Sequence, residues 1–97
     1  MYKIPLNGSD EQFEISINNQ QWEIMVRWIG DPFNSWTFSL GQNGAWIVQG
    51  MAMIAGVNLV RFLNLGFGLR LGWFGKQVPL TKTNLGVDYF LYVTDDD

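Results

Sequence analysis

The most regular feature of this chain is the alternation of apolar and polar residues through its first half. Apolar side chains occupy every second position in 13–17, in 22–28 and in 36–40. A period of two is typical of β-strands that bury one face. This pattern predicts three consecutive antiparallel strands, a meander.

The connection between the first two strands supports this assignment. Asn18-Asn19-Gln20-Gln21 is a tight-turn sequence, because asparagine tolerates a positive φ. A two-residue loop at Asn19-Gln20 would place Ile17 opposite Trp22. The same register would pair Ile15 with Ile24, Phe13 with Val26, and Glu14 nearly with Met25. All the apolar side chains would then share one face, and a slip by one residue would expose them.

Two further turns continue the meander. The stretch 30–35 predicts a longer turn that would bring Trp28 near Trp36, and Val26 near Phe38. Asn43-Gly44 is the strongest short hairpin signal in the chain. The apolar run 45–48 that follows indicates a strand covered on both sides, and its pattern leaves open which face Trp46 takes.

The second half of the chain has a weaker pattern. Residues 59–63 have helical spacing for at most one turn, and 69–74 alternate again around Gly72, where we expect a bulge or a close backbone approach. The long connector 76–86 leads to a last strand over 87–93. Both faces of that strand are apolar or aromatic, so we expect it to be central or part of an interface.

The tripeptide Asn-Leu-Gly occurs at 64–66 and at 84–86. Each copy precedes a predicted strand and is interpreted as a turn that ends in a glycine with positive φ.

About seven short strands without a convincing helix predict an all-β fold, a single small antiparallel sandwich or barrel. The length of 97 residues fits one β domain over 1–97, with a solvated acidic tail at 95–97.

The residue inventory argues against an enzyme. The chain has no histidine and no cysteine, so the common acid–base, thiol and zinc mechanisms are absent. Glu14 and Glu23 invite comparison with a glycosidase carboxylate pair, but both are expected on solvated strand faces. The glycines at 66, 68 and 72 do not have phosphate-loop spacing. We expect no catalytic residue, no cofactor and no metal.

The number and placement of charged residues restrict the classes of binding partner. The formal net charge is −3, and the six basic residues are scattered, so a nucleic-acid interface is not expected. The uncharged segment 45–60 is shorter than the roughly 20 residues of a membrane-spanning helix. The first residues lack the apolar core of a secretory signal.

The aromatic residues divide into two groups. Four of them, Trp22, Trp28, Trp36 and Phe38, fall on the predicted inward face. Four others lie in turns or at strand ends and are the candidate interface residues: Phe33, Phe62, Phe67 and Phe74. A rigid ring in a loop buries a large area at small entropic cost, which suits an interface anchor. The alternative is that these rings cap the ends of the domain.

The order of these features resembles a small tailed-phage protein family named for the cyanophage baseplate plug. The residues that carry the resemblance are, in chain order, Ile4-Pro5-Leu6, Phe13-Glu14-Ile15, Trp22 to Trp28, Trp36-Thr37-Phe38-Ser39-Leu40, Gly50, Gly56-Val57-Asn58-Leu59-Val60, Asn64-Leu65-Gly66, Pro79, Asn84-Leu85-Gly86 and Tyr89-Phe90-Leu91-Tyr92-Val93. The resemblance covers nearly the whole chain, although each motif is weak by itself.

The resemblance implies a structural component of a contractile phage tail baseplate, a plug or hub-associated protein of the virion that is made in the host cytoplasm. Its partners would be other phage tail or baseplate proteins, and a homo-oligomer is a further option. The family has no catalytic residues to transfer. The alternative function is a small β-barrel that binds an apolar ligand in its mouth.

Overall fold

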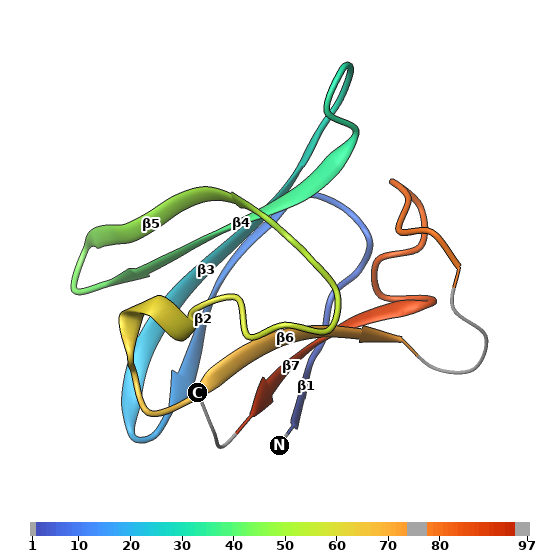
Figure 1. The fold of residues 1–97 in the computed structure, drawn as a ribbon. Helices are drawn as coiled ribbons and strands as arrows, with labels where there is room; N and C mark the ends of the chain where they lie inside the picture. The colour runs from blue at the N-terminus through green and yellow to red at the C-terminus, as the bar shows by residue number, and fades with distance from the viewer. Residues whose placement is uncertain (1, 74–77, 95–97) are drawn as a thin grey trace. The chain divides into compact units, whose positions relative to one another are not determined.

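The computed structural model describes residues 2–73 and 78–94, and within them the chain forms seven β-strands and one 3-10 turn (Figure 1). The elements are β1 (Tyr2–Ile4), β2 (Glu11–Ile17), β3 (Gln20–Ile29), β4 (Ser35–Gln42), β5 (Ala45–Ala52), η1 (Arg61–Leu63), β6 (Gly68–Trp73) and β7 (Tyr89–Thr94).

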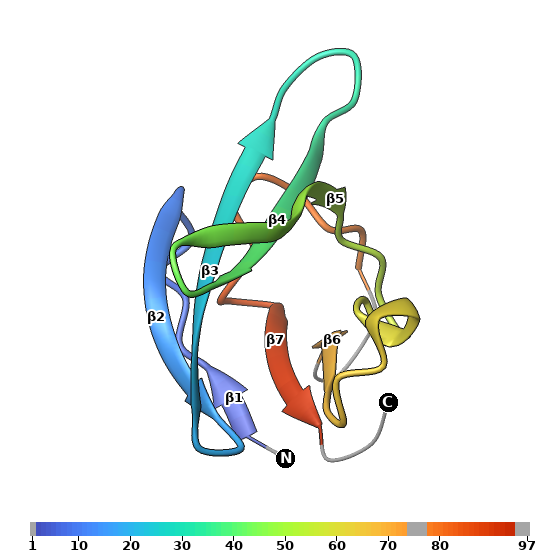
Figure 2. The same cartoon turned by 90° about the vertical axis from the view of Figure 1, so that its left-hand side faces the viewer.

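The strands form two open antiparallel sheets, with the orders β2-β3-β4-β5 and β1-β7-β6 (Figure 2). The predicted all-β class and strand number are confirmed, but neither sheet closes into a barrel. The contacts divide the chain into two compact units. Unit 2 is Ser9–Ala52 and holds the four-stranded sheet, and unit 1 comprises the residues on either side of it. The single domain stays a prediction.

The first hairpin of unit 2 has a different register from the predicted one. Phe13 pairs with Ile24 and Ile15 with Trp22, which is a shift of two residues. The turn residues are Asn18 and Asn19, with φ of 52° and 63°, because a two-residue hairpin turn of this type needs positive φ at both central positions. Asparagine meets that need better than glutamine does. Since the shift is even, the apolar side chains still share one face.

The pairing of β3 with β4 is as predicted. Trp28 lies opposite Trp36 and Val26 opposite Phe38. The two indole rings meet edge to face, with centroids 5.7 Å apart and an interplanar angle of 68°, the arrangement that aromatic quadrupoles favour. The buried apolar side chains of these two strands are Trp22, Ile24, Val26, Trp36, Phe38 and Leu40.

The hairpin at Asn43-Gly44 is confirmed, with φ of 56° and 79°, but β5 is not covered on both sides. It is the edge strand of its sheet, and two register shifts against β4 bend it. Trp46 pairs with Gly41, which pairs with Glu23, so Trp46 lies on the face opposite the buried tryptophans. A Cβ on Gly41 would lie 2.8 Å from Cε3 of Trp46. The indole ring therefore packs against the backbone of Gly41, in the space that a side chain at this position would need.

In unit 1, β7 is the central strand, as the two apolar faces of that segment indicated. Tyr89, Leu91 and Val93 are buried. The β6–β7 register is continuous through Gly72, so no bulge occurs there. The close approach is real, because a Cβ on Gly72 would lie 3.2 Å from Cε2 of Tyr92.

Asn84 organises the connector that precedes β7. Its side-chain amide donates to the carbonyl of Pro79 at 2.8 Å and its Oδ1 accepts from the N–H of Thr81 at 2.7 Å. Its backbone carbonyl accepts hydrogen bonds from the N–H groups of residues 87–89.

The nearby Gly86 has φ +86°, and a Cβ there would lie 2.7 Å from the carbonyl oxygen of Leu6. Both Asn-Leu-Gly copies therefore end in a positive-φ glycine, as predicted, since Gly66 has φ +82°.

The corrected register also changes the surroundings of two carboxylates. Glu14 pairs directly with Glu23, not with Met25, and the amide of Gln12 donates a hydrogen bond to Glu23. Two like charges directly opposite each other on adjacent strands destabilise a sheet.

We predict that Glu14→Lys raises the free energy of unfolding by about 0.2–1 kcal/mol, because it replaces a cross-strand repulsion by an attraction. Glu14→Gln, which removes only the repulsion, should give a smaller gain. Denaturant unfolding at low and high salt measures both variants. A gain for Glu14→Lys that persists in 1 M salt would contradict an electrostatic origin, because salt screens exposed charges.

The two Asn-Leu-Gly glycines provide a matched comparison. Gly66→Ala should cost about 1–2 kcal/mol for left-handed backbone alone, since a Cβ added there would have no neighbour within 4 Å. Gly86→Ala should cost about 1–3 kcal/mol more, because its Cβ would meet the Leu6 carbonyl. Equal losses in the free energy of unfolding would show that the contact with Leu6 has no energetic weight.

Candidate interaction surface

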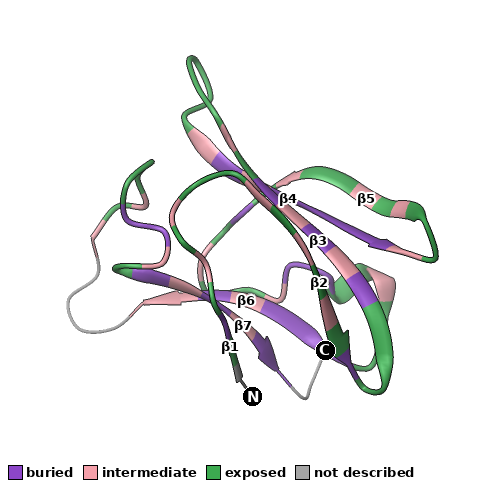
Figure 3. Ribbon diagram, turned by 180° about the vertical axis from the view of Figure 1, so that it is seen from behind, coloured by how far each residue is buried: buried purple, intermediate pink, exposed green. Residues whose placement is uncertain are grey.

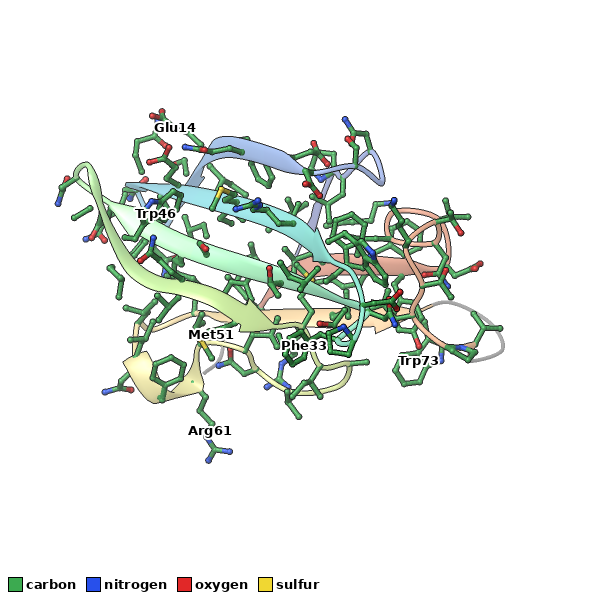
Figure 4. The ribbon with its side chains drawn as sticks, turned by 90° about the horizontal axis from the view of Figure 1, so that it is seen from above. Glu14, Phe33, Trp46, Met51, Arg61 and Trp73 are labelled. Carbon is green, nitrogen blue, oxygen red and sulfur yellow. The ribbon has the colours of Figure 1, made fainter. Side chains whose placement is uncertain are left out.

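The carboxylate pair Glu14 and Glu23 lines a surface pocket of about 290 Å³ at one end of the four-stranded sheet. The rest of its lining comes from Gln21, Trp22, Gln42, Asn43 and Gly44. Glu14 is exposed and Glu23 is half-buried; both were expected on a water-facing strand face rather than in a pocket. Figure 4 labels Glu14 on β2. Within 2–73 and 78–94, no three His, Cys, Asp or Glu side chains gather as metal ligands would.

A second pocket, of about 270 Å³, lies on unit 1 beside Gly72. It is lined by Gly56, Arg70, Leu71, Gly72, Trp73, Tyr92 and Thr94. The Tyr92 ring lies against the backbone of Gly72, where a Cβ would be only 3.2 Å from its Cε2 atom. Arg70 supplies a cationic group and Tyr92 and Thr94 supply hydroxyl groups, so the lining offers apolar contact and several hydrogen-bond donors.

Large apolar side chains are exposed on both units. They are Ile29, Phe33 and Ile47 on unit 2, and Ile54, Val57, Phe62 and Val87 on unit 1. Figure 3 shows the exposed positions in green, including most of β5 and the β3–β4 loop. Chains with exposed apolar groups and little charge are suited to contact with other proteins.

Phe33 lies in the β3–β4 loop, which extends beyond the neighbouring strands at the top of Figure 1. Its side chain is 74% exposed. The loop is held by its own hydrogen bonds: the N–H groups of Phe33 and Asn34 donate to the Gly30 carbonyl at 3.0 and 3.1 Å. The Asn34 amide donates to Oδ1 of Asp31 at 2.8 Å. The backbone is therefore ordered while the ring stays in solvent (Figure 4).

Phe62 lies in the η1 turn and is 62% exposed. The preceding Leu59 and Val60 are buried and anchor the turn. Oδ1 of Asn58 accepts from the N–H groups of Val60 and Leu69, each at 3.1 Å, which ties the turn to β6. The neighbouring Arg61 points away from the turn into solvent (Figure 4).

The other two candidates differ. Phe67 is 2% exposed, so its ring packs inside and does not present a surface. Phe74 lies outside the described residues. The structure therefore places Phe33 and Phe62 on the surface, on different units, and their role at an interface stays a prediction.

Sequence reasoning missed five exposed aliphatic residues of the described chain: Ile29, Ile47, Ile54, Val57 and Val87. Exposed aliphatic side chains carry no signal of their own, because an apolar residue in a loop or edge strand resembles a core residue. The uncharged run 45–60, which contains three of them, was the available hint. Among the described residues, no helix has the length and apolar character needed to cross a membrane.

Two comparisons with known proteins bear on the family of this chain. No match was found among curated proteins. A family model described as the cyanophage baseplate Pam3 plug gp18 matches residues 1–96. Because that match spans almost the whole chain, the resemblance noted from the sequence is confirmed, and the chain belongs to the family of the cyanophage baseplate plug.

Proposed function

We propose that this chain is a structural component of a contractile phage tail baseplate, a plug or hub-associated protein that acts through protein–protein contacts. The observation that carries the proposal is the family match over residues 1–96. The surface supports it, because seven large apolar side chains are exposed within residues 2–73 and 78–94 of a chain with few charges.

The two exposed phenylalanines are the proposed contact anchors. Each lies in a loop whose backbone is fixed by hydrogen bonds, those of Gly30–Asn34 and those around Asn58. A rigid loop loses little conformational freedom on binding, so more of the contact energy remains as affinity. Aromatic rings in such positions commonly dominate an interface.

The alternative function, an apolar ligand in the mouth of a β-barrel, has less support. A barrel mouth requires a closed sheet, and the described strands form two open ones. The unit 1 pocket beside Gly72 is lined by three polar side chains, those of Arg70, Tyr92 and Thr94, among apolar ones, but it lies on the surface of an open sheet and not in a barrel mouth.

We predict that Phe33→Ser or Phe62→Ser weakens the complex with neighbouring tail proteins by about 2 kcal/mol, roughly thirtyfold in Kd. Neither change should alter the free energy of unfolding by more than about 0.5 kcal/mol, because both rings are exposed. The experiment is co-expression with neighbouring tail genes, followed by size-exclusion chromatography with mass determination and titration of the purified partner.

Val87→Ser is the matched control, since it removes exposed apolar surface from another loop. An equal loss of affinity in this variant would show that Phe33 and Phe62 contribute no more to binding than any other exposed apolar residue. A chain that elutes without any tail protein would contradict the proposed function as a whole.

A further inference from the structure

Four strand edges bound the two sheets, and three of them are protected by short length, cover or charge. The edge of β1 is three residues long. The edge of β6 is covered by the chain before η1, where the N–H of Gly56 donates to the Leu71 carbonyl at 3.0 Å and that of Leu59 to the Leu69 carbonyl at 2.8 Å. The edge of β2 carries Glu11 and Glu14. Short length, cover and charge are the usual means of preventing edge-to-edge pairing.

The fourth edge, β5, is neither short nor charged, and its protection is the pair of register shifts against β4. It is eight residues long and contains no charged residue and no proline. Within the described part of the chain its only strand neighbour is β4. Its residues are mostly exposed, and Ile47 is 44% exposed (Figure 3). The two register shifts bend the strand, but its side chains are apolar apart from Gln49 and Gly50, and no described strand pairs with its outer edge.

We infer that β5 is a docking edge that pairs antiparallel with β5 of a second copy of this chain, joining two four-stranded sheets. This inference goes beyond the proposed function and does not depend on it. The unpaired edge of a strand presents a row of backbone hydrogen-bond donors and acceptors. Another extended strand can pair with all of them.

The charges on the edge strands indicate which strand of the second copy pairs with β5. A neutral strand pairs with its own copy without repulsion, whereas a β2–β2 contact would bring Glu11 and Glu14 of two copies together. A β5–β2 contact between copies would be head to tail and would leave a free edge at each end of a growing chain of molecules. A β5–β5 contact has two-fold symmetry, so it consumes the open edge of both copies and stops at two.

We predict that the purified chain alone has a mass of twice 11.1 kDa at high concentration and that Ile47→Lys raises the dissociation constant at least tenfold. A lysine on β5 of each copy adds a charge to both of the paired edges, and charge on an edge strand is one of the usual means of preventing such pairing. Glu14→Lys is the matched control, because it adds a lysine to the opposite edge strand of the same sheet, and it should leave the dimer intact. Light scattering and analytical ultracentrifugation measure the mass.

A second test does not depend on the folding of the lysine variant. The chain has no cysteine, so single cysteines at Ala45, Ile47 and Gln49 report on β5 directly. In an antiparallel two-fold pair, equal positions separate by about 7 Å for each residue away from the axis. Oxidation should therefore cross-link one of these variants far more than the others, and Ser16→Cys on β2 not at all.

Several results would overturn the inference: a monomer at all concentrations, open-ended aggregates, a dimer that tolerates Ile47→Lys, or cross-linking through Ser16→Cys. Its failure is distinguishable from failure of the proposed function. A monomer that still binds neighbouring tail proteins rejects only the β5 pairing, and a β5 dimer that binds none of them rejects only the baseplate role.

Discussion

The pairing of β3 with β4 is the constraint on which unit 2 depends. Trp28 opposite Trp36, Val26 opposite Phe38 and Ile24 opposite Leu40 place the bulky side chains of both strands on one face. Because side chains alternate along a strand, this register places the pairs Glu23–Gly41, Met25–Ser39 and Arg27–Thr37 on the other face. That division puts Trp46 over Gly41 and lets Phe33 extend from a loop that adds nothing to the core.

The sequence was sufficient for features that follow from period and turn chemistry. Alternation predicted the strands, Asn43-Gly44 predicted a hairpin, and two apolar faces marked the central strand. The register of the first hairpin was wrong by two residues, because the choice between Asn18-Asn19 and Asn19-Gln20 depends on which pair accepts positive φ at both positions. A shift of two preserves the faces, so the pattern of apolar residues could not detect it, and the pairing of Glu14 with Glu23 was missed for the same reason.

The surface was less predictable than the sheets. An uninterrupted apolar run looks the same in a buried strand and in an edge strand, so β5 was expected to be covered. Loop aromatics are equally ambiguous: Phe33 and Phe67 both adjoin strand ends, yet one is exposed and the other is buried. Whether such a residue is exposed depends on which distant segments of the chain pack against it. The local pattern of apolar and polar residues does not show those contacts.

The connectivity of unit 1 has a consequence for how the molecule is made. Tyr2 pairs with Val93, and the residues between β1 and β6 include all of Ser9–Ala52. During synthesis the β2–β5 meander needs only contacts between successive strands, whereas β1 must wait until β7 has left the ribosome. Until then the three-stranded sheet lacks its central strand, so this sheet forms only once β7 is available, after the β2–β5 meander can already have folded.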